Sequence, residues 1–310
     1  MTRDASEKTT KKIRELPREE YILPGTRSCA ACGLMLTYRH ALKALAQKKV
    51  VVTVPASCMT VLHGVYPITP VKVHCINNPF AATGASASGI VAGLKVTGKQ
   101  DYTVVAFAGD GGTYDIGIQA LSGALERGVD FMYVCYDNEG YMNTGTQRSS
   151  ASPAGMITTT TPLLTKLQQK KDMIRIVEAH NIPYIATSSP AYPLDLYDKF
   201  VAARDMKGPR YLEVHAPCPP GWGFPNKDMI KIGKLAVECG VHVLFEIKDG
   251  RFRLTSRSLR LAEKGTRKPI KQYISRQTRF RKMSDQQIQR FQELTDARWE
   301  HFLQRHQEHA

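Results

Sequence analysis

Short, strongly apolar stretches alternate with segments of helical pattern along most of the chain. The apolar stretches are non-alternating, as in parallel strands covered by helices on both faces. Strands are predicted at 49–55, 71–76, 101–112, 130–140, 182–188, 210–217 and, as the last strand, 242–250. A glycine-bounded loop leading into a helix is predicted at 25–45, and helices are predicted at 83–96, 113–128, 170–180, 193–205 and 226–240. This order predicts an α/β fold with a doubly wound, mainly parallel sheet.

Three regions depart from this alternation. Residues 1–24 are polar and irregular, and we interpret them as an N-terminal arm before a domain of residues 25–250. Residues 141–161 are polar and rich in Thr and Ser, too long for an ordinary connection, which indicates a functional loop. Residues 251–310 are predicted to form a C-terminal extension that is helical after Pro269.

Composition narrows the class of protein. Apolar residues make up 42% of the 310 residues and charged residues 23%, values typical of globular proteins. Because apolar runs stay well short of the roughly 18 residues of a membrane helix, no membrane association is expected. The first twenty residues lack the apolar core of a secretory signal, so we expect a cytoplasmic protein.

Positive charge is concentrated at the C-terminal end. The net charge is +15, of which +9 lies in residues 251–310. Such a segment suits a face packed on another subunit, an acidic redox partner or a nucleic acid. Because it lacks aromatic residues at a stacking spacing, no nucleic-acid partner is expected.

Two glycine turns at strand ends carry the first candidate chemistry. Gly109-Asp110-Gly111-Gly112 follows one predicted strand, and Asp137-Asn138-Glu139-Gly140 follows the next. Glycines before a helix let backbone N–H groups approach a phosphate, and a carboxylate there requires an intervening cation such as Mg²⁺. Either motif taken alone is better interpreted as a simple tight turn. Together, with 26 residues between Gly111 and Asn138, they resemble the thiamine diphosphate signature.

The seven cysteines form a second candidate site. Cys29 and Cys32 are separated by two residues, Cys58 follows the first strand, and Cys218 lies among prolines. Four such thiolates could bind a [4Fe–4S] cluster or a structural zinc, while the C-x-x-C pair alone could also form a redox disulfide. The other three cysteines, Cys75, Cys135 and Cys239, are interpreted as structural.

Several longer motifs, together with CAACG near the start, resemble one family. The β subunits of pyruvate:ferredoxin and related 2-oxoacid:ferredoxin oxidoreductases contain similar sequences over about residues 22–250. The segments that carry the resemblance are GDGGTYDIGIQALSGALERG, YDNEGYMNTGTQRSSASP, KKDM, AHNIPYIATS and APCPPGW, and in the extension YISRQTRF.

The resemblance implies a set of roles for residues of this chain. Asp110, Asn138 and the Gly140 carbonyl would bind Mg²⁺ and through it thiamine diphosphate, and Asn143 would approach the substrate. One [4Fe–4S] cluster would be held by Cys29, Cys32, Cys58 and Cys218. An α subunit would complete the thiamine site, and ferredoxin would accept the electrons.

The substrate and the reaction remain open at this stage. The resemblance implies oxidative decarboxylation of a 2-oxoacid, with pyruvate and coenzyme A favoured. Tyr114 and Gly140 depart from common pyruvate members, so oxalate without coenzyme A, branched-chain 2-oxoacids, indolepyruvate and 2-oxoglutarate stay as alternatives. From other classes, a non-redox thiamine decarboxylase and a zinc-stabilised nucleic-acid-binding module are the competing hypotheses. The Lys170-Lys171 pair is interpreted as a solvated helix start.

Overall fold

The computed structural model describes residues 12–64 and 67–309. Its strands form one eight-stranded sheet in the order β2-β1-β3-β4-β6-β5-β7-β8. The first six strands of that order are parallel, whereas β7 and β8 are each antiparallel to the preceding neighbour. The strands are β1 (Lys49–Pro55), β2 (His74–Asn78), β3 (Tyr102–Gly109), β4 (Met132–Asp137), β5 (Tyr184–Ser188), β6 (Arg210–His215), β7 (Phe245–Lys248) and β8 (Arg251–Leu254).

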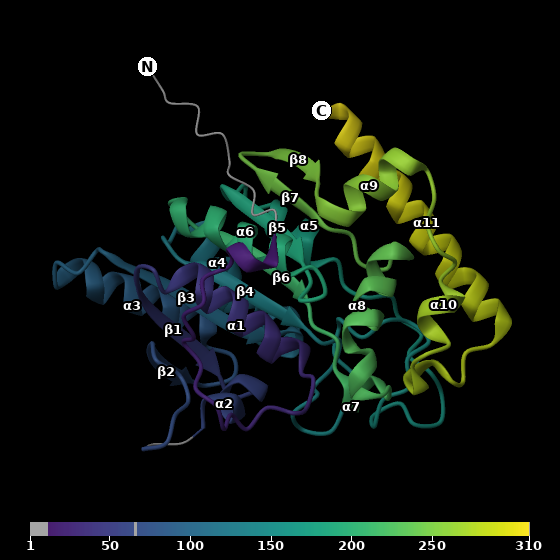
Figure 1. Cartoon of the computed structure of the whole chain (residues 1–310), viewed down its shortest axis with the longest axis horizontal. Helices are drawn as coiled ribbons and strands as arrows, with labels where there is room; N and C mark the ends of the chain where they lie inside the picture. The colour runs from purple at the N-terminus through teal and green to yellow at the C-terminus, as the bar shows by residue number, and fades with distance from the viewer. Residues whose placement is uncertain (1–11, 65–66, 310) are drawn as a thin grey trace.

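Helices cover both faces of the sheet (Figure 1). One face packs on α1, α2 and α6, and the other on α3, α4, α5, α9 and α11, while α7, α8 and α10 enclose a third apolar cluster. The helices are α1 (Gly33–Leu45), α2 (Cys58–His63), α3 (Thr83–Val96), α4 (Ile118–Glu126), α5 (Met173–Glu178), α6 (Pro193–Asp205), α7 (Pro219–Trp222), α8 (Met229–Glu238), α9 (Ser256–Lys264), α10 (Lys271–Ile274) and α11 (Asp285–Glu308). The predicted doubly wound α/β class is confirmed.

The predicted last strand at 242–250 was wrong, because β8 follows it. Asp249 and Gly250 have φ angles of 49° and 79° and join β7 to β8 in a hairpin. An Asp-Gly pair with both residues at positive φ is a favoured two-residue hairpin turn. The predicted boundary at residue 250 thus falls in a turn between two strands of the same sheet.

The C-terminal segment packs on the body of the protein. Phe252, Leu254 and Trp299 are buried in the same apolar cluster as the sheet residues. Helix α11, yellow in Figure 1, runs along one side of the molecule. A helix not predicted before Pro269, α9, also contributes the buried Leu261. No helix in the described ranges is long and apolar enough to cross a membrane.

Part of the predicted N-terminal arm packs against α1; residues 1–11 lie outside the described residues. The Glu20 carboxylate pairs with Arg39 at 2.6 Å and with Lys43 at 2.7 Å. The buried Lys43 also donates to the Pro17 carbonyl at 2.7 Å. Residues 17–20 are therefore fixed on α1 by charge-assisted hydrogen bonds.

Candidate functional site

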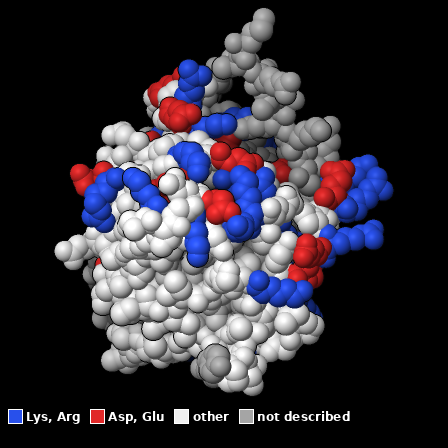
Figure 2. Space-filling model, turned by 90° about the vertical axis from the view of Figure 1, so that its left-hand side faces the viewer, with Lys and Arg blue, Asp and Glu red and all other residues white. Residues whose placement is uncertain are grey.

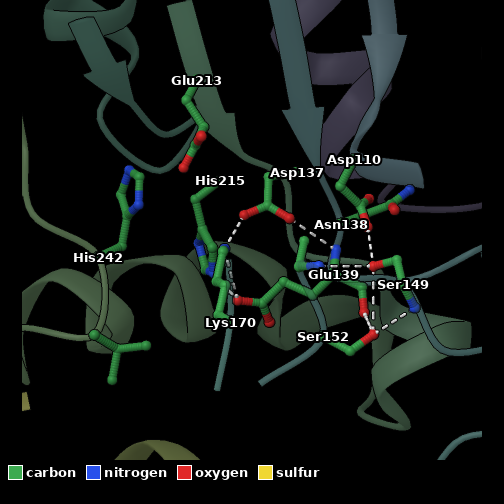
Figure 3. Close-up of polar contacts among 12 residues, drawn as sticks. Asp110, Asp137, Asn138, Glu139, Ser149, Ser152, Lys170, Glu213, His215 and His242 are labelled. Carbon is green, nitrogen blue, oxygen red and sulfur yellow. Dashed lines mark hydrogen bonds and ion pairs between the residues drawn. The ribbon is translucent and has the colours of Figure 1, made fainter. Parts of the chain in front are cut away.

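The two glycine turns meet at the carboxyl edge of the sheet, where ligands bind in open α/β folds. Strands β3 and β4 are hydrogen-bonded neighbours, with Gly109 opposite Tyr136. Asp110 follows β3 and Asn138 follows β4, so both side chains emerge at one edge (Figure 3). The Asn138 amide lies 2.8 Å from Asp110 Oδ1 and 3.0 Å from the Gly140 carbonyl oxygen.

This arrangement fits a magnesium ion. The Asn138 NH₂ group donates to both neighbouring oxygens, and rotating the amide by half a turn brings its oxygen toward the same two atoms. Three oxygens then converge from Asp110, Asn138 and Gly140. Carboxylate, amide and carbonyl oxygens are the ligand types of hard divalent cations.

Asp110 is fully buried, and burial raises the pKa of its carboxyl group to about 7. The Ser149 hydroxyl, which donates to Oδ2, and the positive charge of Lys170 oppose that rise in pKa. A buried carboxylate is costly without a partner, so this site favours a bound cation.

Glu139, between the candidate magnesium ligands, adopts a left-handed backbone conformation with φ of 64°. Such a conformation in a residue other than glycine is strained and persists only where surrounding contacts fix it. Its buried carboxylate pairs with Arg279 at 2.6 Å and lies 3.5 Å from Lys170 Nζ. Burial disfavours the charged carboxylate, yet Arg279 and Lys170 outweigh it and lower the pKa of Glu139.

The expectation of a solvated Lys170 was wrong. Its side chain is about three-quarters buried and forms an ion pair with Asp137 at the end of β4 (Figure 3). Burial raises the pKa of Asp137 well above its usual value, and Lys170 opposes that shift. Lys170 therefore supports the turn from both sides of Asn138, through Asp137 and Glu139.

Trp222 and Arg279 complete the support of this turn. Trp222 Nε1–H donates to the Asn138 carbonyl at 2.7 Å, and the Arg279 guanidinium lies 3.8 Å from the centre of the Trp222 indole ring. Trp222 ends the family-like segment APCPPGW, but no pattern in the sequence linked it to Asn138. The signal for Arg279 was its place in the family-like YISRQTRF segment, and no pattern linked it to Glu139.

The glycines after β3 lie under aromatic rings. A Cβ atom added to Gly111 would lie 2.6 Å from the Tyr141 ring, and one at Gly112 would lie 3.2 Å from Phe80. Gly111 begins a short π-helical segment that leads into α4. Such segments are frequent at functional sites. Contact of Gly109, Gly111 and Gly112 with a diphosphate stays a prediction.

Asn143 lies in the loop that directly follows the Asn138 turn. It is exposed in the turn that the backbone bridge between Tyr141 and Gln147 closes. Its role toward a substrate stays a prediction. Tyr114, the departure noted in the sequence, is buried and donates to Glu213 at 2.6 Å. Tyr114 and Glu213 line a cavity of about 410 Å³ together with Lys170 and His215.

Four cysteines approach one another from separate elements. Cys29 and Cys32 precede α1, Cys58 begins α2, and Cys218 precedes α7. The Gly33 N–H donates to the Pro217 carbonyl at 3.2 Å, which joins the start of α1 to the segment after β6. A Cβ atom at Gly33 would lie only 2.7 Å from that carbonyl oxygen, so this approach requires glycine.

Electrostatic interactions connect the four thiols. Burial raises the pKa of Cys58 to about 12, and the thiols of Cys32, Cys218 and Cys29 contribute to that rise. Burial also raises the pKa of Cys218 to about 12, with Cys32 and Cys29 again contributing. Cys29 is exposed and the other three are partly buried, so the raised pKa values keep these thiols protonated unless a positively charged group binds them. In the described ranges, no three His, Cys, Asp or Glu side chains are grouped to hold one metal ion.

The cysteine group adjoins the candidate magnesium site. The Asp110 carboxylate is among the charges that raise the pKa of Cys58. The other cysteines are elsewhere: Cys135 is buried in β4, and the Cys75 and Cys239 thiols donate to the carbonyls of Val73 and Pro269. Their predicted structural role agrees with these surroundings.

Comparison with known proteins identifies the class and then the family. The model for the thiamine pyrophosphate enzyme, C-terminal TPP binding domain, matches residues 56–214. The chain therefore belongs to the thiamine pyrophosphate enzymes. Among these, it belongs to the β subunits of 2-oxoacid:ferredoxin oxidoreductases, the family of the PorB and VorB subunits.

Two relatives support this placement, and one solved structure has a similar fold. Pyruvate synthase subunit PorB of Methanothermobacter thermautotrophicus is 45% identical over 287 residues, covering 91% of this chain and 97% of that protein. Ketoisovalerate oxidoreductase subunit VorB of Pyrococcus horikoshii is 43% identical, covering 94% of each. A 2-oxoglutarate:ferredoxin oxidoreductase from Magnetococcus marinus has a similar fold, with a TM-score of 0.55, 21% identity, and coverage of 66% of this chain and 70% of that one.

Proposed function

We propose that this β subunit takes part in the oxidative decarboxylation of pyruvate, with coenzyme A as acyl acceptor and ferredoxin as electron acceptor. The observation that carries the proposal is the proximity of the two candidate sites: Cys58 follows β1, Asp110 follows β3, and these two strands are paired neighbours in the sheet. A decarboxylation site beside an electron acceptor suits oxidation of the substrate rather than simple loss of CO₂. Relatives named for pyruvate and for ketoisovalerate make a branched-chain 2-oxoacid the main alternative substrate.

Magnesium and thiamine diphosphate are assigned to the edge of β3 and β4. Asp110, Asn138 and the Gly140 carbonyl would hold Mg²⁺, and the backbone of Gly109, Gly111 and Gly112 would border the diphosphate. When bound, thiamine diphosphate supplies the carbanion stabilisation that allows CO₂ to leave a 2-oxoacid. Trp222, Arg279 and Lys170 hold the Asn138 turn rigid, and the exposed Asn143 would orient the substrate.

One [4Fe–4S] cluster is assigned to Cys29, Cys32, Cys58 and Cys218. A cubane cluster binds each thiolate through a different iron, so its ligands surround a larger volume than those of a single ion. The positions of these thiols before α1, α2 and α7 suit that requirement. The cluster would accept electrons one at a time and pass them toward ferredoxin.

An uncharged surface supports docking of another subunit beside the thiamine site. Residues 73–94 contain no Lys, Arg, Asp or Glu. Figure 2, which faces the side where α3 lies, shows charged residues in its upper part and an uncharged lower part. Phe80 of this segment packs edge-on to Tyr141, with 6.0 Å between the ring centres, so the surface is continuous with the glycine turns. An α subunit docking here would cover the thiamine site from that side.

An anaerobic assay with a viologen dye tests the substrate and the acyl acceptor. The native complex is given pyruvate with and without coenzyme A, and 2-oxoisovalerate, 2-oxoglutarate and oxalate in parallel. Dye reduction that is fastest with pyruvate plus coenzyme A is the expected result. Faster dye reduction with 2-oxoisovalerate would show that a branched-chain 2-oxoacid is the substrate instead of pyruvate. Dye reduction by oxalate without coenzyme A would make oxalate the substrate and would exclude the acyl-transfer step.

A cysteine series tests the cluster. Cys58→Ser and Cys218→Ser are expected to lower the iron content and the visible absorbance of the anaerobically purified complex. Cys75→Ser is the matched control, because that thiol lies in β2 and donates to the Val73 carbonyl. Unchanged iron in both test variants would contradict the assignment of the cluster to these cysteines, whereas a native complex that binds thiamine diphosphate but contains no iron would favour the non-redox decarboxylase.

A further inference from the structure

The two oxygens of the Asp110 carboxylate have different surroundings. Oδ1 faces the Asn138 amide at 2.8 Å, toward the point where the Gly140 carbonyl also lies. Oδ2 accepts a hydrogen bond from the Ser149 hydroxyl (Figure 3). Because Asp110 is fully buried, this hydroxyl is fixed against it and is not exchanged for solvent. Only Oδ1 therefore faces the other candidate magnesium ligands.

Ser149 is itself held in place by the loop that contains it. Its backbone N–H donates to Ser152 Oγ at 3.0 Å, and its own Oγ accepts from the Ala151 N–H at 3.2 Å. Ser152 in turn donates to the Glu139 carbonyl at 2.8 Å. The two serines thus join the Thr/Ser-rich loop to both glycine turns at once. Ser149 is fixed relative to Asp110 and Glu139 together.

A carboxylate that offers one oxygen discriminates between cations. Mg²⁺ requires a small, near-octahedral set of oxygens, whereas the larger Ca²⁺ takes more ligands and readily accepts both oxygens of one carboxylate. We propose that Ser149 is a positioning residue that keeps Asp110 to one-oxygen coordination and thereby selects Mg²⁺ over Ca²⁺. The inference rests on the proposed magnesium site and adds the device that makes that site selective.

The test compares metal-dependent binding of thiamine diphosphate in the intact complex. The complex is stripped with a chelator, and thiamine diphosphate binding is measured by calorimetry during titration with Mg²⁺ or Ca²⁺. For Ser149→Ala, we expect the ratio of apparent Mg²⁺ to Ca²⁺ affinity to fall at least tenfold, with Mg²⁺ affinity itself reduced. Ser149→Thr, which keeps the hydroxyl, should retain a ratio near that of the native complex.

Controls separate this inference from the magnesium assignment. Ser150→Ala alters the neighbouring residue, whose described contact with Asp115 is made through its backbone N–H, and should leave the ratio unchanged. An unchanged ratio in a folded Ser149→Ala complex, or an equal loss of affinity for both metals, would overturn the role of Ser149. If Ser149→Ala does not fold, a lowered ratio in Ser149→Thr would overturn it as well. If the native complex binds thiamine diphosphate equally well without a divalent cation, the magnesium site itself fails.

Discussion

Arg279 is the residue on which the candidate magnesium turn most depends. It bonds the Glu139 carboxylate, donates to the Tyr273 hydroxyl at 2.9 Å and lies over Trp222. These contacts hold a residue in left-handed conformation next to Asn138. A charge so deeply buried is destabilising once its partner is removed.

Replacement of Arg279 should therefore destabilise the subunit. Arg279→Leu removes the closer of the two basic side chains that pair with Glu139 and leaves Lys170. We expect the free energy of unfolding to fall by about 3 kcal/mol. The measurement is the melting temperature of the native complex, which should fall by several degrees. Arg276→Leu changes an exposed arginine of the same segment and serves as control. Equal melting temperatures for both variants would contradict the structural role of Arg279.

Single residues show what the sequence could and could not predict. The structure brings Asp110, Asn138 and Gly140 together because their signature is local to two neighbouring strand ends, and their role as magnesium ligands stays a prediction. Ser149, Lys170 and Arg279 were missed because each acts through a partner distant in sequence: Ser149 bonds Asp110, and Lys170 pairs with Asp137. Their residue types are common on surfaces, so composition alone suggests solvation.

At the scale of elements, the start of α1 positions half of the candidate cluster ligands. Gly33 allows the backbone after Cys32 to approach Pro217, one residue before Cys218. The Met35 and Leu34 N–H groups at this helix start point to Cys32 and partly offset the rise in its pKa that burial causes. The start of α1 therefore fixes the position of the Cys32 thiol and also provides N–H groups that favour its thiolate form.

A methyl group at Gly33 should separate these elements. In Gly33→Ala the Cβ atom would meet backbone atoms of Pro217 and Ala216 at 2.7–2.9 Å, and rigid backbone cannot yield as a side chain can. We expect a loss of at least half of the iron bound by the native complex, measured by anaerobic iron analysis. Gly89→Ala, which places its methyl group in open space on α3, should retain iron. Full iron content in Gly33→Ala would disprove the requirement for close approach.

The contact of residues 17–20 with α1 should depend on pH. The hydrogen bond from Arg39 lowers the pKa of Glu20 from 4.5 to about 2, although partial burial acts in the opposite direction. A lowered carboxyl pKa stabilises the folded form above pH 4.5, and this contribution is lost as the pH falls from 4.5 to about 2. Hydrogen exchange of residues 17–20 should therefore become relatively less protected over that range.

Glu20→Gln is the variant for that measurement. It should remove the acid-dependent change in protection and show reduced protection already at neutral pH. Exchange at α6, which is remote from this carboxylate in sequence, serves as an internal reference. A native protein with unaltered relative protection between pH 4.5 and 2.5 would contradict the prediction.

Helices and strands were predicted most accurately where one continuous apolar or helical pattern runs between two clear turns. Strand β1 and helices α3 and α6 were predicted with their observed bounds, because each is a continuous apolar or helical pattern between clear turn residues. The predicted helix at 113–128 includes a π-helical turn and begins its regular part only at Ile118. Strand β8 was missed because its charged, exposed positions alternate with buried ones, a pattern assigned to the basic extension.

At the scale of the whole molecule, charge is distributed unevenly. Basic residues of the C-terminal segment partly serve internal contacts, since Arg305 pairs with Glu178 and Arg267 with Asp296. The segment 73–94 instead carries no charge, and α3 exposes Ala92, Gly93 and Val96. An exposed face without charge on so basic a protein is suited to permanent association with another chain.

A charge introduced on α3 should weaken assembly. Ala92→Glu buries an unpaired carboxylate if another subunit covers this face, so we expect much less α subunit to co-purify with the β subunit. Size-exclusion chromatography of the co-expressed subunits gives the measurement. Gln307→Glu, at an exposed position of α11, is the matched control. Normal assembly of Ala92→Glu would place the subunit contact elsewhere.

The pairing of Glu139 with Arg279 also has a consequence for the order of synthesis. The turn that follows β4 emerges from the ribosome when more than half of the chain has been made, but its arginine partner is translated 140 residues later. A nascent chain that ends before residue 279 leaves Glu139 without that guanidinium. We therefore expect stable insertion of a cofactor at this turn to follow translation of nearly the entire subunit, and a chain that ends before Arg279 should not retain that cofactor.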